Sequence, residues 1–279
     1  MLVINIPHNK YQIVIKCCDE DLERILSIQY YPYIDYSFME TDKLIAYITQ
    51  YDDATIALTY DKNEIIVNTK LHQNLIVIRK IIQSLLIFED NFIALHASCV
   101  SLDSSAVFII GKTMSGKSTL TSYLMSEGFS YLTDDFTLIN LNSLSVIPFR
   151  KIIHIRKGTH QFLYDNNIKY PALNFQVEDF YRQLILPPLI NEDVNFNVVA
   201  GIFIDRDEDN FDDSINEIKN LSKKRDMCVK NLFTSADLIN NIKKVNDLVT
   251  RIPFYHTRNN LLESTASRIT NTINELINK

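Results

Sequence analysis

The segment 109–120, IIGKTMSGKSTL, constrains the fold more than any other part of this chain. The chain has 279 residues but only 5 glycines, and two of them, Gly111 and Gly116, lie within this segment. Lys117 and Ser118 follow the second glycine directly. Glycine adopts backbone conformations that other residues avoid, so this spacing predicts a tight loop with a defined backbone path.

The loop has the form G-x-x-x-x-G-K-[ST], a pattern that holds phosphate groups. Its glycines let successive N–H groups turn toward an anion, and the helix that follows adds the positive end of its dipole. Lys117 can pair with β- and γ-phosphates, and the Ser118 hydroxyl can ligate Mg²⁺. We therefore predict a nucleotide site formed by Gly111, Lys112, Thr113, Met114, Ser115, Gly116, Lys117, Ser118 and Thr119.

The residues around the loop support this interpretation. The apolar run AVFII precedes it and predicts a buried strand, and a helix is expected to begin near Lys117. A strand, a glycine loop and a helix in this order are the context that the motif requires.

An acidic pair, Asp134 and Asp135, follows the predicted strand SYLT. Inside a strand, neighbouring side chains point to opposite faces, but at its end both can turn toward one ligand. One carboxylate can hold Mg²⁺, and the other can accept a proton from an attacking hydroxyl. Such a pair also occurs as a turn or a helix cap, so its functional interpretation depends on the phosphate loop before it.

Four further polar residues are candidates for the same site. His96 lies at the start of the strand before the loop, and Arg150, Arg156 and Arg182 can clamp phosphates. Taken singly, each is more typical of an ordinary polar or surface position.

Composition excludes several classes of protein. A net charge of −6 and a pI of about 5.5 give no basic surface for general nucleic-acid binding. No stretch of ~18 uncharged apolar residues is present, and the N-terminus lacks the features of a signal peptide, so we expect no membrane segment. The 4 cysteines lack metal-ligand spacing, which favours reduced thiols in a cytoplasmic protein.

Two regions differ in their pattern. Residues 1–70 alternate as strands around one helix, and predict a small β-rich N-terminal domain with a possible role in acceptor binding. Its tyrosine-rich segment 30–36 favours packing at the protein surface, and acceptor binding is the second interpretation. Residues 71–279 combine strands with helices at about 72–88, 235–250 and 261–278, and a polar, extended segment at 165–195. The fold class is therefore α+β or α/β.

The run ALHASCV…AVFIIGKTMSGKSTLTSYLMSEGFSYLTDDFTLI resembles the kinases related to HPr kinase/phosphorylase. Weaker similarity in PFRKIIHIRKGT, NVVAGIFIDRDED and RIPFYHTRNN extends the resemblance over about residues 72–279. It implies a carboxykinase-type P-loop core, with a mixed β-sheet and flanking helices. It also implies that Asp134 is the general base toward a serine hydroxyl, that Asp135 and Ser118 hold the metal, and that Lys117, His96 and Arg182 belong to the catalytic site.

The chain also departs from that family. HPr kinases carry a glycine-rich signature after the acidic pair, whereas HIRKGTHQF has a single glycine. This argues against HPr as the acceptor and favours a resemblance to the stand-alone relatives, among them kinases that phosphorylate a serine of a lasso-peptide precursor. Carboxykinases themselves are much longer chains.

We therefore expect a cytoplasmic kinase that uses ATP and Mg²⁺ and phosphorylates a serine of a peptide or small protein. It has no nucleic-acid or membrane partner, and a homo-oligomer is compatible with the sequence. Two alternatives stay open: a kinase of a small-molecule hydroxyl such as free serine, and a non-catalytic switch that binds a partner when ATP is bound. The intact set of Lys117, Ser118, Asp134 and Asp135 argues against the switch.

Overall fold

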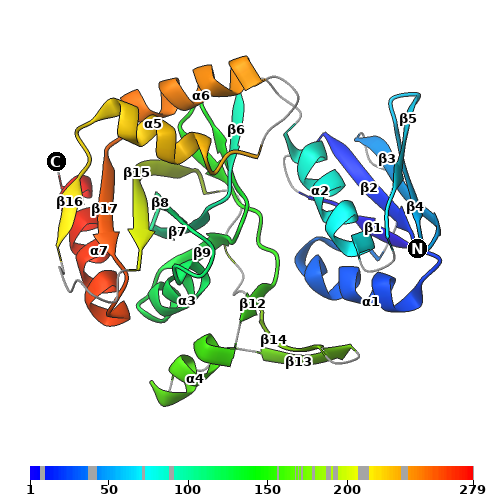
Figure 1. Ribbon diagram of the computed structural model, residues 1–279, viewed down its shortest axis with the longest axis horizontal. Coiled ribbons are helices and arrows are strands. Elements are labelled where there is room, and N and C mark those ends of the chain that lie inside the picture. Colours follow the sequence, from blue (N-terminus) through cyan, green and yellow to red (C-terminus); the bar gives the residue numbers. More distant parts are fainter. Residues whose placement is uncertain are drawn as a thin grey trace. The chain divides into compact units, whose positions relative to one another are not determined.

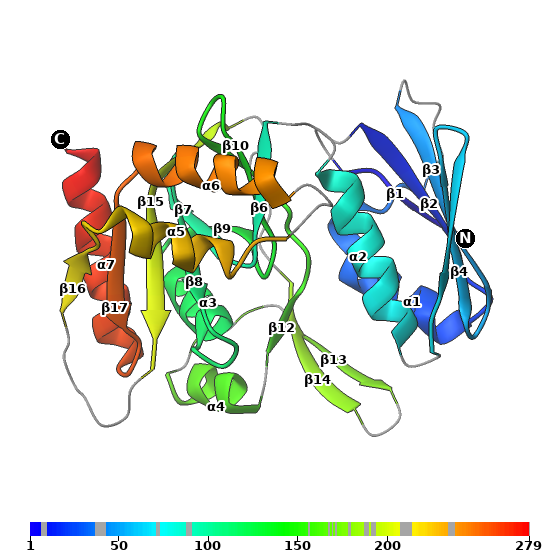
Figure 2. The same ribbon diagram turned by 45° about the horizontal axis from the view of Figure 1, so that its top comes forward.

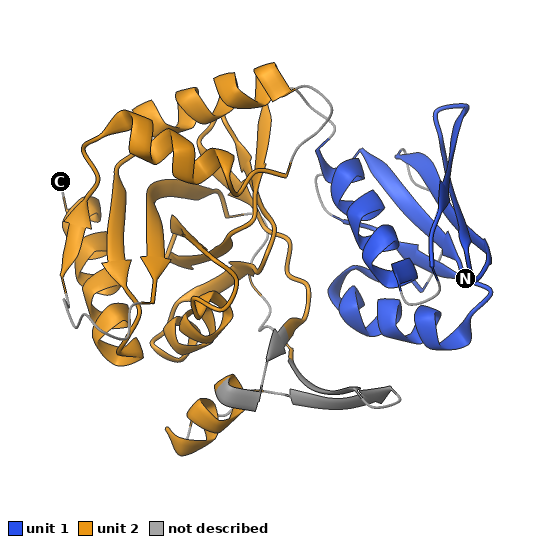
Figure 3. Cartoon of the chain, viewed as in Figure 1, with its two compact units in different colours: residues 1–90 blue, residues 91–279 orange. Residues whose placement is uncertain are grey.

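The computed structural model forms two compact units, residues 1–90 and 91–279, shown in Figure 3. It describes residues 1–6, 10–36, 43–70, 73–87, 91–155, 157–166, 168, 170, 172–177, 180–186, 190, 194–206, 214–233 and 238–278; the side chains of 154–155, 157–158, 172–177 and 180–184 are outside the description.

The first unit is a five-stranded sheet in the order β1-β2-β3-β4-β5. Only the β2–β3 pair is parallel among these four pairings. The strands are β1 (Leu2–Ile4), β2 (Tyr11–Lys16), β3 (Leu44–Asp52), β4 (Thr55–Tyr60) and β5 (Asn63–Asn68), and the helical segments are α1 (Glu20–Gln29), η1 (Tyr31–Tyr33) and α2 (Asn74–Leu86). All five strands coincide with the alternating runs of the sequence.

Local sequence explains these elements. Asp19 caps α1 by accepting hydrogen bonds from the backbone N–H groups of Asp21 and Leu22. The helix α2 packs against α1 and β4 (Figures 1 and 2). Because of this packing, the first unit ends after Asp90, whereas the sequence pattern placed the boundary after residue 70.

The second unit is built on a nine-stranded mixed sheet. Its main path is β6-β10-β11-β15-β8-β7-β9, and β17 pairs with β15 and β16. The strands are β6 (Phe92–Leu95), β7 (Ser98–Leu102), β8 (Ser105–Gly111), β9 (Ser130–Thr133), β10 (Thr137–Asn140), β11 (Ser145–Ile147), β15 (Phe196–Asp205), β16 (Ile215–Glu217) and β17 (Phe254–Arg258). The mixed α+β class is thus as predicted.

Helices cover both faces of this sheet (Figures 1 and 2). The alternation of β8 directs Val107 and Ile109 into one core with α3 (Lys117–Ser126) and α7 (Leu262–Ile277). Phe108 and Ile110 enter the opposite core with α6 (Leu238–Arg251) and α5 (Leu221–Val229). The sequence pattern did not predict α5.

Three parallel strands determine where the site forms. The strand β15 pairs in parallel with both β8 and β17, so all three end at the same edge of the sheet. The glycine loop leaves β8 at that edge. Loops that follow the carboxyl ends of parallel strands commonly build binding sites.

A three-stranded sheet and a short helix lie beside the main sheet. The order is β12-β14-β13, with β12 (Ile153–Ile155), β13 (Ala172–Val177), β14 (Phe180–Ile185) and α4 (Lys157–Asp165). Part of the segment that sequence predicted as an extended excursion therefore forms a hairpin. None of the described helices combines the length and apolar character needed to cross a membrane.

Candidate active site

The glycine loop connects β8 to α3, as its spacing predicts. β8 ends at Gly111, and α3 begins at Lys117, directly after Gly116. Gly116 is in the left-handed region with φ +89°, where other residues are strained. Met114 also has a positive φ of 71°. The backbone between strand and helix therefore passes twice through the left-handed region, at Met114 and at Gly116.

Both glycines are also required by their neighbours. A Cβ at Gly111 would lie 2.6 Å from the carbonyl oxygen of Ile204 on β15, and a Cβ at Gly116 would lie 2.6 Å from Nδ2 of Asn259. That Asn259 amide donates a hydrogen bond of 2.9 Å to the Ser115 carbonyl, which ties the loop to the end of β17. Asn259 is a site residue that sequence reasoning missed.

Gly116→Ala and Gly128→Ala form a matched pair of variants. Both glycines have positive φ, but only Gly116 has an atom within 4 Å of the added Cβ. We expect both changes to lower the free energy of unfolding by about 1 kcal/mol through backbone strain. Only Gly116→Ala should also weaken ADP binding, by about fivefold, because it displaces a hydrogen bond worth ~1 kcal/mol. Chemical denaturation and calorimetric titration measure the two effects, and equal ADP affinity in both variants would contradict this account.

Polar groups gather inside the loop. The Lys117 ammonium is buried and donates to the carbonyl oxygens of Gly111 at 2.8 Å and Lys112 at 3.5 Å. The Ser115 hydroxyl is buried, with no hydrogen-bond partner among the described residues. Buried polar groups normally find partners, so this hydroxyl and the lysine fit a loop that holds an anion with many oxygens.

The acidic pair lies beside the first turn of α3. Ser118 Oγ donates to Asp134, at 3.0 Å from Oδ2 and 3.3 Å from Oδ1. The Asp134 side chain is buried, whereas that of Asp135 is 40% exposed. Asp135 has a φ of 64°, so the strand end turns sharply between the two carboxylates. The structure thus brings Asp134 to Ser118.

His96 and a buried lysine complete this side of the site. Nδ1 of His96 lies 3.1 Å from the backbone carbonyl oxygen of Asp135. The Lys151 ammonium lies 3.9 Å from Oδ2 of Asp135, and its side chain is 2% exposed. No motif marks Lys151 in the sequence, which drew attention to its neighbour Arg150 instead. Arg150 is buried as well; Arg156 and the side chain of Arg182 lie outside the described residues.

Burial shifts the protonation of two groups here. Burial, followed by repulsion from Asp135, raises the pKa of Asp134 from 3.8 to about 6, although Lys151, Ser118 and Lys117 oppose the shift. Burial also lowers the pKa of His96, so its neutral form is favoured. Asp134 therefore titrates closer to neutrality than an ordinary carboxyl group does.

The raised pKa of Asp134 predicts a pH dependence of stability. Between its unfolded pKa of 3.8 and its folded pKa of about 6, the folded chain keeps a proton that the unfolded chain has lost. The free energy of unfolding contributed by this group therefore falls as pH rises through that window. Asp134→Asn, which cannot ionise, should lack this contribution. Urea unfolding of both proteins at a series of pH values gives a difference curve, and a flat curve would refute the assignment.

The donor set fits Mg²⁺. Within the described residues, no group of three or more His, Cys, Asp and Glu side chains can hold a metal ion. Ser118 and Asp134 supply oxygen donors at adjoining positions. Mg²⁺ suits such a site because it commonly binds one or two carboxylates and completes its shell with water and substrate phosphates.

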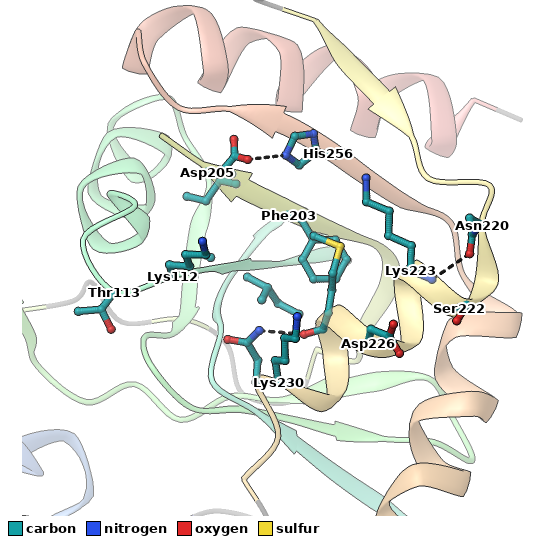
Figure 4. A pocket seen from close by; sticks show the side chains of 15 residues that line it. Lys112, Thr113, Phe203, Asp205, Asn220, Ser222, Lys223, Asp226, Lys230 and His256 are labelled. Atoms are coloured by element: carbon teal, nitrogen blue, oxygen red, sulfur yellow. Dashed lines mark hydrogen bonds and ion pairs between the residues drawn. The ribbon is translucent and has the colours of Figure 1, made fainter. Parts of the chain in front are cut away.

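A cavity of about 770 Å³ opens beside the first residues of the loop. Figure 4 shows Lys112 and Thr113 on one side of it and residues of α5 on the other. Oδ2 of Asp205, the last residue of β15, lies 3.0 Å from Nε2 of His256, which lies within β17. Sequence reasoning identified neither residue, although both belong to strand patterns at the sheet edge that carries the loop.

Comparison with known proteins adds little. No protein-family model and no curated protein matches the sequence. Among solved structures, the chain is similar to the Hpr(Ser) kinase/phosphatase from Coxiella burnetii, with a TM-score of 0.30 and 13% identity over 66% of this chain and 98% of that one. Such values carry no argument about function, so the site is interpreted from its own residues.

Proposed function

We propose that this protein is a kinase that transfers the γ-phosphate of ATP to a hydroxyl group in the presence of Mg²⁺. The observation that carries the proposal is the hydrogen bond between Ser118 and Asp134. It joins the phosphate loop to the acidic pair, so the anion-binding and proton-accepting groups form one site. A loop without such a partner would suit nucleotide binding alone.

Each residue of the site has a proposed role that follows from its position. The Gly111–Ser118 backbone and the Lys117 ammonium hold the phosphates and offset their charge. Mg²⁺ supplies further neutralisation when bound, and Ser118 with Asp134 would hold it. Asp135, the more exposed carboxylate, would accept the proton of the attacking hydroxyl. This division reverses the one that the family resemblance implies, and the Ser118–Asp134 contact is the reason for preferring it.

The neighbours of Asp135 suit that role. The Lys151 ammonium lies 3.9 Å from Oδ2 of this carboxylate, and the Asp135 carbonyl oxygen lies 3.1 Å from Nδ1 of His96, whose neutral form is favoured. His96 and Lys151 would therefore position the strand end and stabilise negative charge near the acceptor. Arg182, which lies in β14, stays a proposed phosphate clamp on the family resemblance alone.

A serine of a peptide or small protein is the proposed acceptor, on the resemblance to stand-alone kinases. To test it, γ-labelled ATP and Mg²⁺ are incubated with the enzyme and an extract of the source cells. The extract is then separated into small-molecule, peptide and protein fractions. We expect label in a peptide or protein fraction with the wild type and none with Lys117→Ala. Label only in small molecules would transfer the proposal to an acceptor such as free serine. Label only in free phosphate would favour a nucleotide-dependent switch.

A further inference from the structure

The cavity beside the loop has no part in the roles assigned above. It lies entirely within the second unit and is formed by the loop, the ends of β15 and β17, and α5. Its volume of about 770 Å³ falls within the range of small-molecule sites, which run from ~300 to ~1,000 Å³. The following inference rests on the proposed function, since it concerns the same nucleotide.

The sheet order places this cavity and the acidic pair at strands on either side of β8. β8, which carries the loop, has β7 and then β9 on one side and β15 on the other. Asp134 and Asp135 follow β9, whereas the cavity is lined by the ends of β15 and β17. One wall of the cavity still adjoins the acidic side, because the backbone N–H of His96 donates to the carbonyl oxygen of Asn231 at 2.6 Å.

Phosphoryl transfer requires this kind of separation. The attacking and leaving oxygens lie roughly in line on opposite sides of the transferred phosphorus. If the acceptor hydroxyl meets Asp135, the leaving diphosphate and its nucleoside must extend away from Asp135. The cavity at the end of β15 is one direction available to them, and the far side of α3 is the other.

The lining has the composition that a nucleoside needs. Phe203 and Met227 supply apolar surface. Asn220, Ser222 and Asp226 supply hydrogen-bonding groups (Figure 4). Ligand pockets typically combine an apolar wall with a few polar groups of this kind. The lysines 112, 223 and 230 also line the cavity, and within the described residues none of them forms an ion pair. Their positive charge suits a ligand whose phosphates lie at the entrance.

We propose that this cavity is the nucleoside half of the nucleotide site, and that α5 recognises the base and ribose of a nucleoside triphosphate. The loop would hold the phosphates, and the cavity would distinguish a nucleotide from an inorganic polyphosphate. The competing location is the far side of α3, where Thr119 Oγ1 lies 2.7 Å from Thr159 Oγ1 of α4.

Filling the cavity tests the proposal. Ser222 is exposed and lines the cavity, whereas its exposed neighbour Leu221 does not line it. Calorimetry measures the affinity of the full chain for two ligands, Mg²⁺-ATP and Mg²⁺-tripolyphosphate, which has no nucleoside. The variants are Ser222→Trp and the control Leu221→Trp. We expect Ser222→Trp to weaken ATP binding roughly tenfold or more, with tripolyphosphate affinity and the control unchanged. Unchanged ATP affinity, or equal losses for both ligands, would overturn the inference.

The wild type separates this inference from the function on which it rests. If it binds neither ligand, the proposed kinase function fails. If it binds tripolyphosphate as tightly as ATP, only the nucleoside pocket fails. Photolabelling of the wild type with 8-azido-ATP needs no variant. Label on the peptide that contains α5 supports the proposal, and label on α4 places the nucleoside elsewhere and overturns it.

Discussion

Replacing Lys117 with alanine is expected to lower the rate of phosphoryl transfer by a factor on the order of 10² to 10³. The Lys117 ammonium is buried against the Gly111 and Lys112 carbonyls, so its charge acts where water is largely excluded. A charge at such a place stabilises the negative charge of the transition state more than a surface charge does. The initial rate of label transfer from γ-labelled ATP measures the loss.

Two further variants test whether the loss of transfer comes from the Lys117 charge and not from lost packing or from the removal of any lysine. Lys117→Met keeps most of the buried aliphatic stem, so it should lose transfer while its unfolding temperature stays close to that of the wild type. Lys243→Ala removes an exposed lysine of α6 and should transfer phosphate at the wild-type rate. Wild-type transfer by Lys117→Met would mean that the loop holds no phosphate during the reaction.

The second large effect is expected for the acidic pair. Asp135→Asn should retain ATP binding but lose phosphoryl transfer by a factor on the order of 10² to 10⁴, the usual contribution of a general base. Asp134→Asn should instead raise the Mg²⁺ concentration needed for activity, because Asp134 is the carboxylate that accepts the Ser118 hydrogen bond. Rates at a series of Mg²⁺ concentrations separate the two roles.

The opposite pattern would restore the assignment based on family resemblance. In that case Asp134→Asn would retain nucleotide binding and lose transfer at every Mg²⁺ concentration, and Asp135→Asn would be rescued by the metal. Asp134 has one property that suits a base, a pKa raised to about 6. Its burial and its contact with Ser118 leave less room for an incoming hydroxyl than Asp135 has.

The closeness of the two carboxylates underlies both the pH-dependent stability and the proposed catalytic roles. A buried carboxylate beside a second carboxylate is costly to ionise, so ionised Asp134 destabilises the folded chain near neutral pH. Proteins retain such arrangements where function requires charged groups close together. A neutral variant of Asp134 should thus be more stable near neutral pH and less active.

The sequence by itself determined the local part of the site. Spacing of Gly111, Gly116 and Lys117 specified a strand, a loop and a helix, because backbone conformation there depends on residues a few positions apart. The alternating apolar residues of β8 specified two buried faces for the same reason. The position of an acidic pair at a strand end was visible too.

Only the tertiary structure decided which side chains meet. Asn259 reaches Ser115 from 144 residues away, and the contact between Asp205 and His256 exists because β15 and β17 pair in parallel. Lys151 enters the site through a buried segment that carries no motif. The choice of Asp134 over Asp135 as the partner of Ser118 depends on a turn with φ of 64°. Such contacts follow from strand order and packing, which patterns of neighbouring residues do not encode.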